Sequence, residues 1–168
     1  MTIQPANRLN SISDYVHLAW GQRIKEVEAT TGNKVLNVSP GIPYFRPSQH
    51  YLDALQRFVQ EPDAHLYPPY GPLPEFSAAL QHWYQSRFHV ALPTENLYPV
   101  LGSKDAIAHI ALALINPGDE VLVPDPGYPA FTSSTLIAGG IPIPYALGED
   151  AHPPLDIATL EKQINPRT

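Results

Sequence analysis

The chain has 168 residues, 43% of them hydrophobic, and carries a formal net charge of -6 at pH 7. This length and composition allow a sizeable hydrophobic core and do not indicate a disordered protein. The 10 Lys and Arg residues are spread along an acidic chain and form no basic face, so no nucleic-acid partner is expected, and the absence of cysteine excludes a disulfide scaffold.

Membrane and metal partners are not predicted either. The longest apolar run, residues 106–115, is too short to cross a bilayer, and the polar start of the chain lacks a signal-peptide core. We therefore expect a soluble cytoplasmic protein. The 7 histidines show no metal-binding spacing such as His-Glu-x-x-His, so no metal site is expected.

The first part of the chain predicts a helix followed by an irregular segment. Ser13–Asp14 can cap a helix that runs to about Thr30, and Gly32 fits its C-terminal end. Residues 34–38 predict a short strand. Residues 39–47 contain three prolines and a glycine, and so predict a rigid extended loop.

Two amphipathic helices are predicted next, separated by an aromatic loop. The first has Pro47 in its first turn and ends near Glu61–Pro62. The second follows the loop of residues 65–72 and closes around Phe88. The apolar faces are formed by Leu52, Leu55, Phe58 and Val59 in the first helix and by Phe76, Leu80, Trp83 and Tyr84 in the second.

The central stretch predicts a strand, a glycine turn, a helix and another strand. Val100–Leu101 form a short strand that leads through Gly102 into a helix with apolar residues at helical spacing up to Ile115. Ser103 is a suitable N-cap for this helix. Residues 120–124 form an aliphatic run without polar alternation, as expected of a strand covered on both faces.

The last part of the chain predicts a further helix and strand. Residues 130–138 form the helix, which Gly139–Gly140 ends, and residues 141–145 form a strand whose prolines favour a sheet edge. Asp156 can cap a final helix through Ile164. Strand, helix and strand in this order indicate an α/β fold with a parallel sheet.

The start of the central helix is a candidate anion site. Ligands of parallel α/β sheets gather beyond the carboxyl ends of the strands, and free N–H groups at a helix start bind phosphate. Gly102, Ser103 and Lys104 would lie there, with Asp105 in the first turn. From these residues alone, an ordinary capped helix start explains the pattern more simply.

Motifs in a fixed order resemble the class I aminotransferases, which are pyridoxal-phosphate enzymes of fold type I. They are Gly41-x-Pro43-x-Phe45, then Tyr67 ahead of a Leu-Pro-Glu-Phe helix start, then Gly102-Ser103-Lys104, then Pro-Gly-Asp-Glu-Val-Leu-Val-Pro-x-Pro-x-Tyr from Pro117 to Tyr128. The resemblance covers residues 35–168. It implies part of a three-layer α/β/α large domain with a mainly parallel sheet and an N-terminal helical arm. Residues 1–46 would be the N-terminal helix and small-domain segment, and residues 47–168 the first part of the cofactor-binding domain.

The resemblance also implies contacts with pyridoxal 5'-phosphate. The backbone at Gly102, Ser103 and Lys104 would hold the phosphate group, in agreement with the argument from the helix start. Tyr128 would stack on the pyridine ring, a role suited to a flat aromatic face. The hydroxyl of Tyr67 would reach the phosphate across the interface of a homodimer.

Contacts with the substrate are implied in the proline-rich loop. Gly41 would lie over the substrate carboxylate, where a glycine allows close approach of the backbone, and Ile42 would lie beside the substrate. Two positions depart from the family pattern. Pro72 stands where the family has a glycine, with Gly71 one place early, and Ser77 stands where it has an arginine.

Each of these assignments has a structural alternative. Tyr128 would serve as packing at the sheet edge. Tyr67 and Tyr70, beside two prolines, would serve as loop packing or as a polyproline-like recognition segment. We expect the Lys104 side chain to be solvated, because the motif uses only its backbone N–H.

No catalytic residue is assigned in this chain. The family's Schiff-base lysine, the aspartate that pairs with the pyridine nitrogen and the arginine that binds the α-carboxylate would all lie downstream of Thr168. None of the four lysines has the setting of that catalytic lysine: they are Lys25, Lys34, Lys104 and Lys162. The 168-residue chain alone is therefore expected to be inactive.

The leading hypothesis is an aminotransferase that moves an amino group from an amino acid to a 2-oxo acid. A β-lyase, a decarboxylase or a cyclising synthase of the same fold is an alternative, because such enzymes share the phosphate and ring contacts. A non-catalytic truncated remnant is a further hypothesis.

Overall fold

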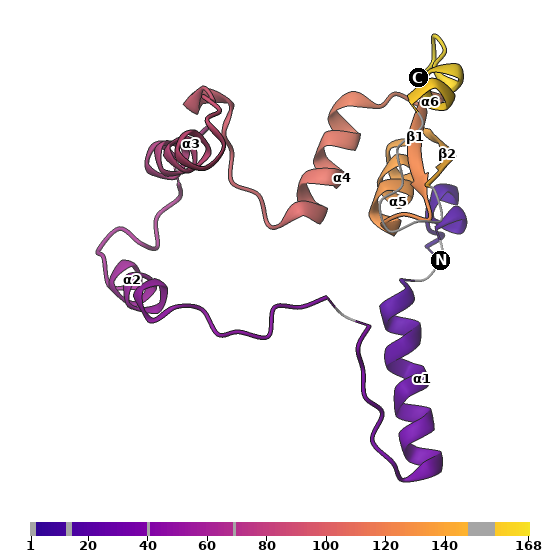
Figure 1. The fold of residues 1–168 in the computed structure, drawn as a ribbon, viewed down its shortest axis with the longest axis horizontal. Helices are drawn as coiled ribbons and strands as arrows, with labels where there is room; N and C mark the ends of the chain where they lie inside the picture. The colour runs from indigo at the N-terminus through magenta and orange to yellow at the C-terminus, as the bar shows by residue number, and fades with distance from the viewer. Residues whose placement is uncertain (1–2, 13–14, 40, 69, 148–156) are drawn as a thin grey trace. The chain divides into compact units, whose positions relative to one another are not determined.

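The structure is a computed structural model that describes residues 3–12, 15–39, 41–68, 70–147 and 157–168. It divides into two compact units (Figure 1). The first unit comprises residues 1–36 and 100–168, and the second comprises residues 37–99. The predicted boundary between residues 46 and 47 concerns the domains of a complete enzyme and stays a prediction.

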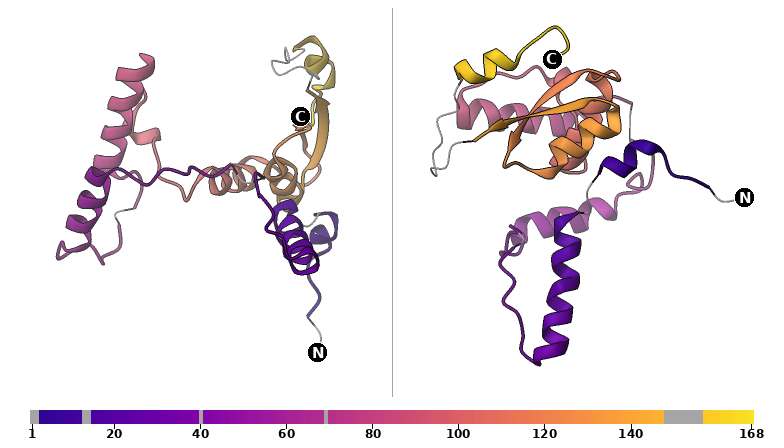
Figure 2. Two further views of the ribbon diagram at one scale, coloured as in Figure 1. Left: turned by 60° about the horizontal axis from the view of Figure 1, so that its bottom comes forward. Right: turned by 90° about the vertical axis from the view of Figure 1, so that its right-hand side faces the viewer.

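The first unit is built on two parallel strands. β1 (Glu120–Asp125) pairs along its whole length with β2 (Ile141–Ala146). The helix α5 (Pro129–Ala138) connects the strands and packs against them, as Figure 2 shows. A preceding helix, α4 (Ser103–Leu114), packs against α5. The predicted order of helix, strand, helix and strand is confirmed, and so is the parallel pairing.

Glycine and aspartate set the ends of these elements. After α4, the carboxylate of Asp119 accepts the N–H of Asn116 at 2.7 Å and closes a turn into β1. Gly139 ends α5 in the left-handed conformation with φ 88°, as predicted for a C-cap glycine. Gly140 is buried, and a Cβ there would lie 2.7 Å from Cγ2 of Ile115. A side chain at this position would therefore push α5 and the β2 start away from the end of α4.

The core of the first unit lies where α4, α5 and β1 meet. Ala111, Val123 and Ala130 are its buried apolar residues. Thr135 is also buried, and its hydroxyl donates to the carbonyl of Phe131 at 2.8 Å, which satisfies it within α5. An apolar groove of about 420 Å³ runs beside this core and is lined by side chains of α4, β1 and α5. The unit is therefore a partial α/β domain.

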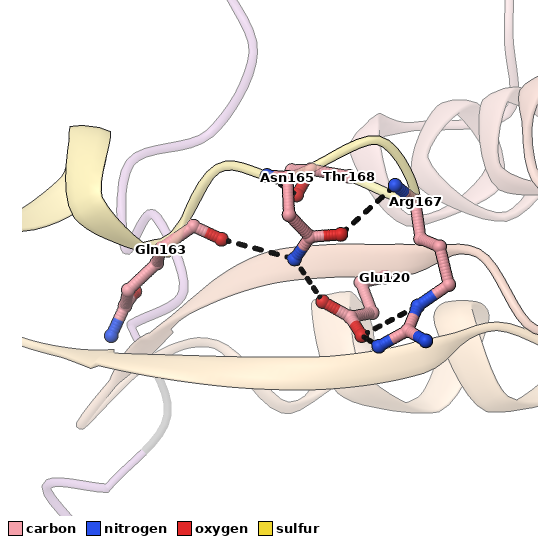
Figure 3. Close-up of polar contacts among 5 residues, drawn as sticks. All are labelled: Glu120, Gln163, Asn165, Arg167 and Thr168. Carbon is pink, nitrogen blue, oxygen red and sulfur yellow. Dashed lines mark hydrogen bonds and ion pairs between the residues drawn. The ribbon is translucent and has the colours of Figure 1, made fainter.

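Asn165 and Arg167 are hydrogen-bonded to Glu120 at the start of β1 (Figure 3). The Glu120 carboxylate accepts from the Asn165 side-chain amide at 2.7 Å and from Nε of Arg167 at 3.0 Å, with a second bond from the same guanidinium. The Glu120 N–H donates to the Arg167 carbonyl at 2.7 Å. Hydrogen bonding from Asn165, then from Arg167, lowers the pKa of Glu120. These bonds follow α6 (Ile157–Gln163), whose predicted cap Asp156 lies outside the described residues.

The N-terminal part of the first unit contains a short 3-10 helix and a long α-helix. The 3-10 helix, η1 (Asn7–Ser11), contacts α5, and Arg8 donates to the carbonyl of Ile137 at 3.2 Å. The long helix, α1 (Val16–Thr31), ends at Gly32 in the left-handed conformation, as predicted. The predicted cap Ser13–Asp14 lies outside the described residues.

The second unit contains the two predicted amphipathic helices. α2 (Gln49–Val59) begins after Ser48, whose hydroxyl accepts the N–H of Tyr51 at 3.3 Å. The predicted position of Pro47 in the first turn is therefore wrong, because serine supplies the capping oxygen that proline lacks. α3 (Pro74–Phe88) has the predicted end, with His89 as its left-handed C-cap.

A buried serine joins α3 to the segment that follows it. Ser77 is fully buried, and its hydroxyl donates to the carbonyl of Leu97 at 2.9 Å. Leu97 follows the 3-10 helix η2 (Thr94–Asn96), which also contacts α3. Ser77, at the position where the family pattern has an arginine, is therefore a small residue whose hydroxyl is hydrogen-bonded within this unit.

Two predicted strands are absent from the described part of the chain. Residues 34–38 and Val100–Leu101 have no ladder partner, since β1 and β2 pair only with each other there. An extended segment without a neighbouring strand lacks the cooperative stabilisation that a sheet provides. Leu36 and Leu101 are accordingly 87% and 93% exposed.

Candidate functional site

A glycine in an unusual conformation begins the candidate site. Gly102 immediately precedes α4 with φ 84° and ψ 167°, a region that glycine alone occupies readily. The prediction that Ser103 is the N-cap is wrong by one residue. Gly102 takes that position because it can turn the chain sharply, and Ser103 is the first residue of the helix.

Backbone amides are available at the start of α4. The first N–H that donates within the helix is that of Ala106, to the Gly102 carbonyl at 3.3 Å. The amides of Ser103, Lys104 and Asp105 come before this bond and are not used by the helix ladder. Together with the positive end of the helix dipole, they form the arrangement that binds phosphate in proteins.

The Asp105 carboxylate supports the turn. One oxygen accepts the N–H of Leu101 at 3.0 Å, and the other lies 3.1 Å from Nδ1 of His109. The Asp105 carboxylate therefore interacts with a residue before the turn and with one a helical turn later. Asp105 lies in the first turn of α4, as predicted. Sequence reasoning missed the bond to Leu101, which fixes the chain just before Gly102.

Tyr128 lies at the carboxyl end of β1 and caps the start of α5. Its side chain is 39% exposed, and its ring meets that of Phe131 edge to face, with 6.0 Å between the centroids. The preceding turn has no room for a side chain, because a Cβ on Gly127 would lie 2.2 Å from the carbonyl oxygen of Pro124. The sequence analysis did not single out Gly127, although this glycine allows the tight turn that positions Tyr128 after β1.

Lys104, in the first turn of α4, contacts the tyrosines that directly precede α1 and α5. Its ammonium nitrogen lies 5.7 Å from the centroid of the Tyr128 ring and 4.0 Å from that of Tyr15. Hydrogen bonding with Tyr15, then with Tyr128, raises the pKa of Lys104. The side chain is exposed, but the expectation that it is merely solvated is wrong. Tyr15 was missed because it lies far away in sequence and no local pattern marks it.

The structure thus brings part of the predicted site together. In the first unit, Lys104 contacts Tyr128, and Gly102 and Ser103 directly precede Lys104 in the chain. Gly41, Ile42 and Tyr67 belong to the second unit, where Ile42 is 74% exposed and Tyr67 fully exposed. A Cβ on Gly41 would meet no atom within 4 Å in that unit. The roles of all these residues stay predictions.

Comparison with known proteins decides the family. The sequence profile described as "Aminotransferase class I and II" matches residues 33–168. The chain belongs to this family. The LL-diaminopimelate aminotransferase of Desulforudis audaxviator is 35% identical over 148 residues, which are 88% of the chain and 38% of that protein. LL-diaminopimelate aminotransferase 2 of Trichormus variabilis is 37% identical over 142 residues, 83% of the chain and 36% of that protein.

Solved aminotransferase structures agree with this family membership. Aspartate aminotransferase from Rhizobium meliloti matches with a TM-score of 0.90 and 25% identity, over 99% of the chain and 41% of the enzyme. Alanine aminotransferase from Pyrococcus furiosus matches with a TM-score of 0.85 and 29% identity, over 98% and 42%. The chain therefore spans about two fifths of the length of these relatives. The predicted family and fold class are confirmed.

Class I and II aminotransferases depend on pyridoxal phosphate, as predicted. The free amides at the start of α4 suit its phosphate group, and the half-exposed ring of Tyr128 suits its aromatic ring. In the part of the chain that the structure describes, no group of three or more acidic, histidine or cysteine residues is arranged to hold a metal ion. Nor is any described helix of this aminotransferase chain long and apolar enough to span a membrane.

Proposed function

We propose that the protein is a pyridoxal-phosphate-dependent aminotransferase that moves an amino group from an amino acid to a 2-oxo acid. In this proposal the chain supplies the contacts that hold the phosphate and the ring of the cofactor. The proposal is supported chiefly by the contact between Lys104 and Tyr128, in which the ammonium of a residue at the start of α4 lies 5.7 Å from the centroid of a half-exposed tyrosine. A phosphate group and an aromatic ring joined in one small molecule would meet both features at once.

The start of α4 would hold the phosphate by its backbone. Three amides precede the first intrahelical bond, and the twelve-residue helix α4 directs the positive end of its dipole toward them. Because Gly102 holds the turn in a conformation closed to other residues, the amides are directed before the ligand arrives.

Tyr128 would orient the ring of the cofactor. Its ring contacts that of Phe131 in an edge-to-face arrangement, and the residue as a whole is 39% exposed. When bound, pyridoxal phosphate supplies an electron-withdrawing ring that stabilises negative charge on the α-carbon of an amino acid. A stacked tyrosine keeps that ring in one plane and excludes water from one of its faces.

The remaining predicted contacts belong to the same proposal. Gly41 and Ile42 would lie against the substrate carboxylate, and Tyr67 would reach the phosphate of a second subunit in a homodimer. A cytoplasmic location goes with this function. Because several relatives are named LL-diaminopimelate aminotransferase, LL-diaminopimelate is the first amino donor to assay.

Cofactor binding by variants of Tyr128 tests the proposal. Titration with pyridoxal phosphate, followed by absorbance, should show saturable binding that Tyr128→Ala weakens roughly two- to tenfold, the range expected for one aromatic pair. Tyr51→Ala on α2 is the matched control, since Tyr51 is exposed outside the candidate site. A protein that shows no saturable binding would contradict the proposal.

Product analysis separates the alternative reactions. Transamination yields one new amino acid for each 2-oxo acid formed from the donor, whereas β-elimination releases ammonia and decarboxylation releases carbon dioxide. Cofactor binding without any of these products would favour the non-catalytic remnant. Formation of the paired amino acid and 2-oxo acid is the result that the proposal predicts.

A further inference from the structure

A lysine between two tyrosines joins the start of α1 to the candidate site. The Lys104 ammonium lies over the Tyr15 ring at 4.0 Å and near the Tyr128 ring at 5.7 Å. Tyr15 and Lys104 also line a cavity of about 630 Å³ together with residues of α5, including Pro129 directly after Tyr128. Tyr15, which directly precedes α1, is therefore held near Tyr128, the residue proposed to contact the cofactor ring.

The Lys104 ammonium is chemically suited to interact with the side chains of Tyr15 and Tyr128 at the same time. An ammonium group has three N–H donors and no acceptor, so it can serve two phenols together. A cation over a tyrosine face is attracted by the ring quadrupole. Lysine is protonated at neutral pH, and hydrogen bonding to Tyr15 and Tyr128 raises the pKa of Lys104 further.

We propose that Lys104 is a positioning residue whose ammonium holds Tyr15 and Tyr128 together and thereby fixes the Tyr128 ring for the cofactor. The inference rests on the proposed function. Phe131 contacts the Tyr128 ring in an edge-to-face arrangement, and Tyr128 is 39% exposed. Fixing an exposed ring in advance reduces the entropy that is lost when a ligand stacks on it.

The first test measures the Tyr128 ring in the full chain without cofactor. With tyrosine rings labelled for NMR, the Tyr128 signals should change in Lys104→Met and also in Tyr15→Leu, which leaves Lys104 in place. Lys104→Arg keeps a cation and should restore the wild-type signals. All three residues lie at the surface, so these variants should fold. If the Tyr128 signals are unchanged in Tyr15→Leu, the inference is overturned.

The second test measures the affinity for pyridoxal phosphate. Lys104→Met and Tyr15→Leu should each weaken binding roughly two- to fivefold, the size of an exposed cation–π contact. The double variant should be no weaker than either single variant, because both remove the same connection. Lys25→Met, at an exposed site on α1, is the control and should bind as the wild type does.

The outcomes separate this inference from the proposed function. If Lys104→Met weakens binding and Tyr15→Leu does not, then Lys104 acts directly on the cofactor and the positioning role is wrong. If the wild-type chain binds no pyridoxal phosphate, the proposed function fails, while the Tyr128 ring signals still decide whether Lys104 holds the two tyrosines together.

Discussion

Replacing Gly102 with alanine tests how the start of α4 is built. Gly102 has φ 84° and ψ 167°, and a Cβ placed there would meet no heavy atom within 4 Å. Steric contact with neighbours therefore contributes nothing to the effect of Gly102→Ala. The whole cost comes from forcing an L-residue into a backbone region that only glycine occupies readily.

The expected cost is about 1–3 kcal/mol in the free energy of unfolding. The backbone can avoid part of this cost by moving the turn into an allowed region. Such a movement would turn the amides of Ser103 and Lys104 away from their present directions, because both residues follow Gly102 directly. A smaller loss of stability should therefore be accompanied by a larger loss of affinity for pyridoxal phosphate.

Urea unfolding and cofactor titration together measure the two effects. Gly21→Ala is the matched control, since Gly21 lies within α1 and its Cβ would also have no neighbour within 4 Å. Alanine there should stabilise the chain by roughly 0.5–1 kcal/mol, because it improves helix propensity. If Gly102→Ala leaves both stability and cofactor affinity unchanged, the strained turn assigned to Gly102 is wrong.

Two further substitutions test contacts outside the site. Ser77→Ala should lower the free energy of unfolding by about 1 kcal/mol in urea, because it removes the hydrogen bond from a buried hydroxyl to the half-buried carbonyl of Leu97, whereas Ser86→Ala, on the exposed side of the same helix, should change it little. An equal loss for both serines would contradict the buried bond. Asn165 and Arg167 lower the pKa of Glu120, so its contribution to stability is present at neutral pH and is lost as the pH falls below about 5. Glu120→Gln should therefore flatten the acid limb of a plot of melting temperature against pH, and an unchanged limb would show that Glu120 does not carry it.

Periodicity and glycine chemistry in the sequence predict most of the first unit. Apolar spacing identifies α4, the glycine pair after residue 138 marks the end of α5, and an unbroken aliphatic run identifies β1. Gly32 and Gly139 end their helices as expected because a left-handed C-cap is a local property of the backbone. The parallel pairing of β1 and β2 follows from the order of these elements.

Features that depend on distant partners are harder to predict. Residues 34–38 and Val100–Leu101 have strand-like composition, but a strand forms only beside another strand, and sequence composition does not say whether one is present. The contact of Tyr15 with Lys104 joins segments far apart in the chain, so no local pattern announces it. The cap at Gly102 was missed because serine is a common capping residue and the torsion angles of a turn are not visible in composition.

The central claim is that the start of α4 binds the phosphate group of the cofactor. Calorimetric titration with pyridoxamine 5'-phosphate and with pyridoxamine tests it most directly, because neither compound carries the aldehyde that reacts with surface lysines. Since charge-assisted hydrogen bonds from the amides of Ser103 and Lys104 would be lost with the phosphate, the phosphorylated compound should bind roughly tenfold tighter or more. Equal affinity for the two compounds would contradict the claim.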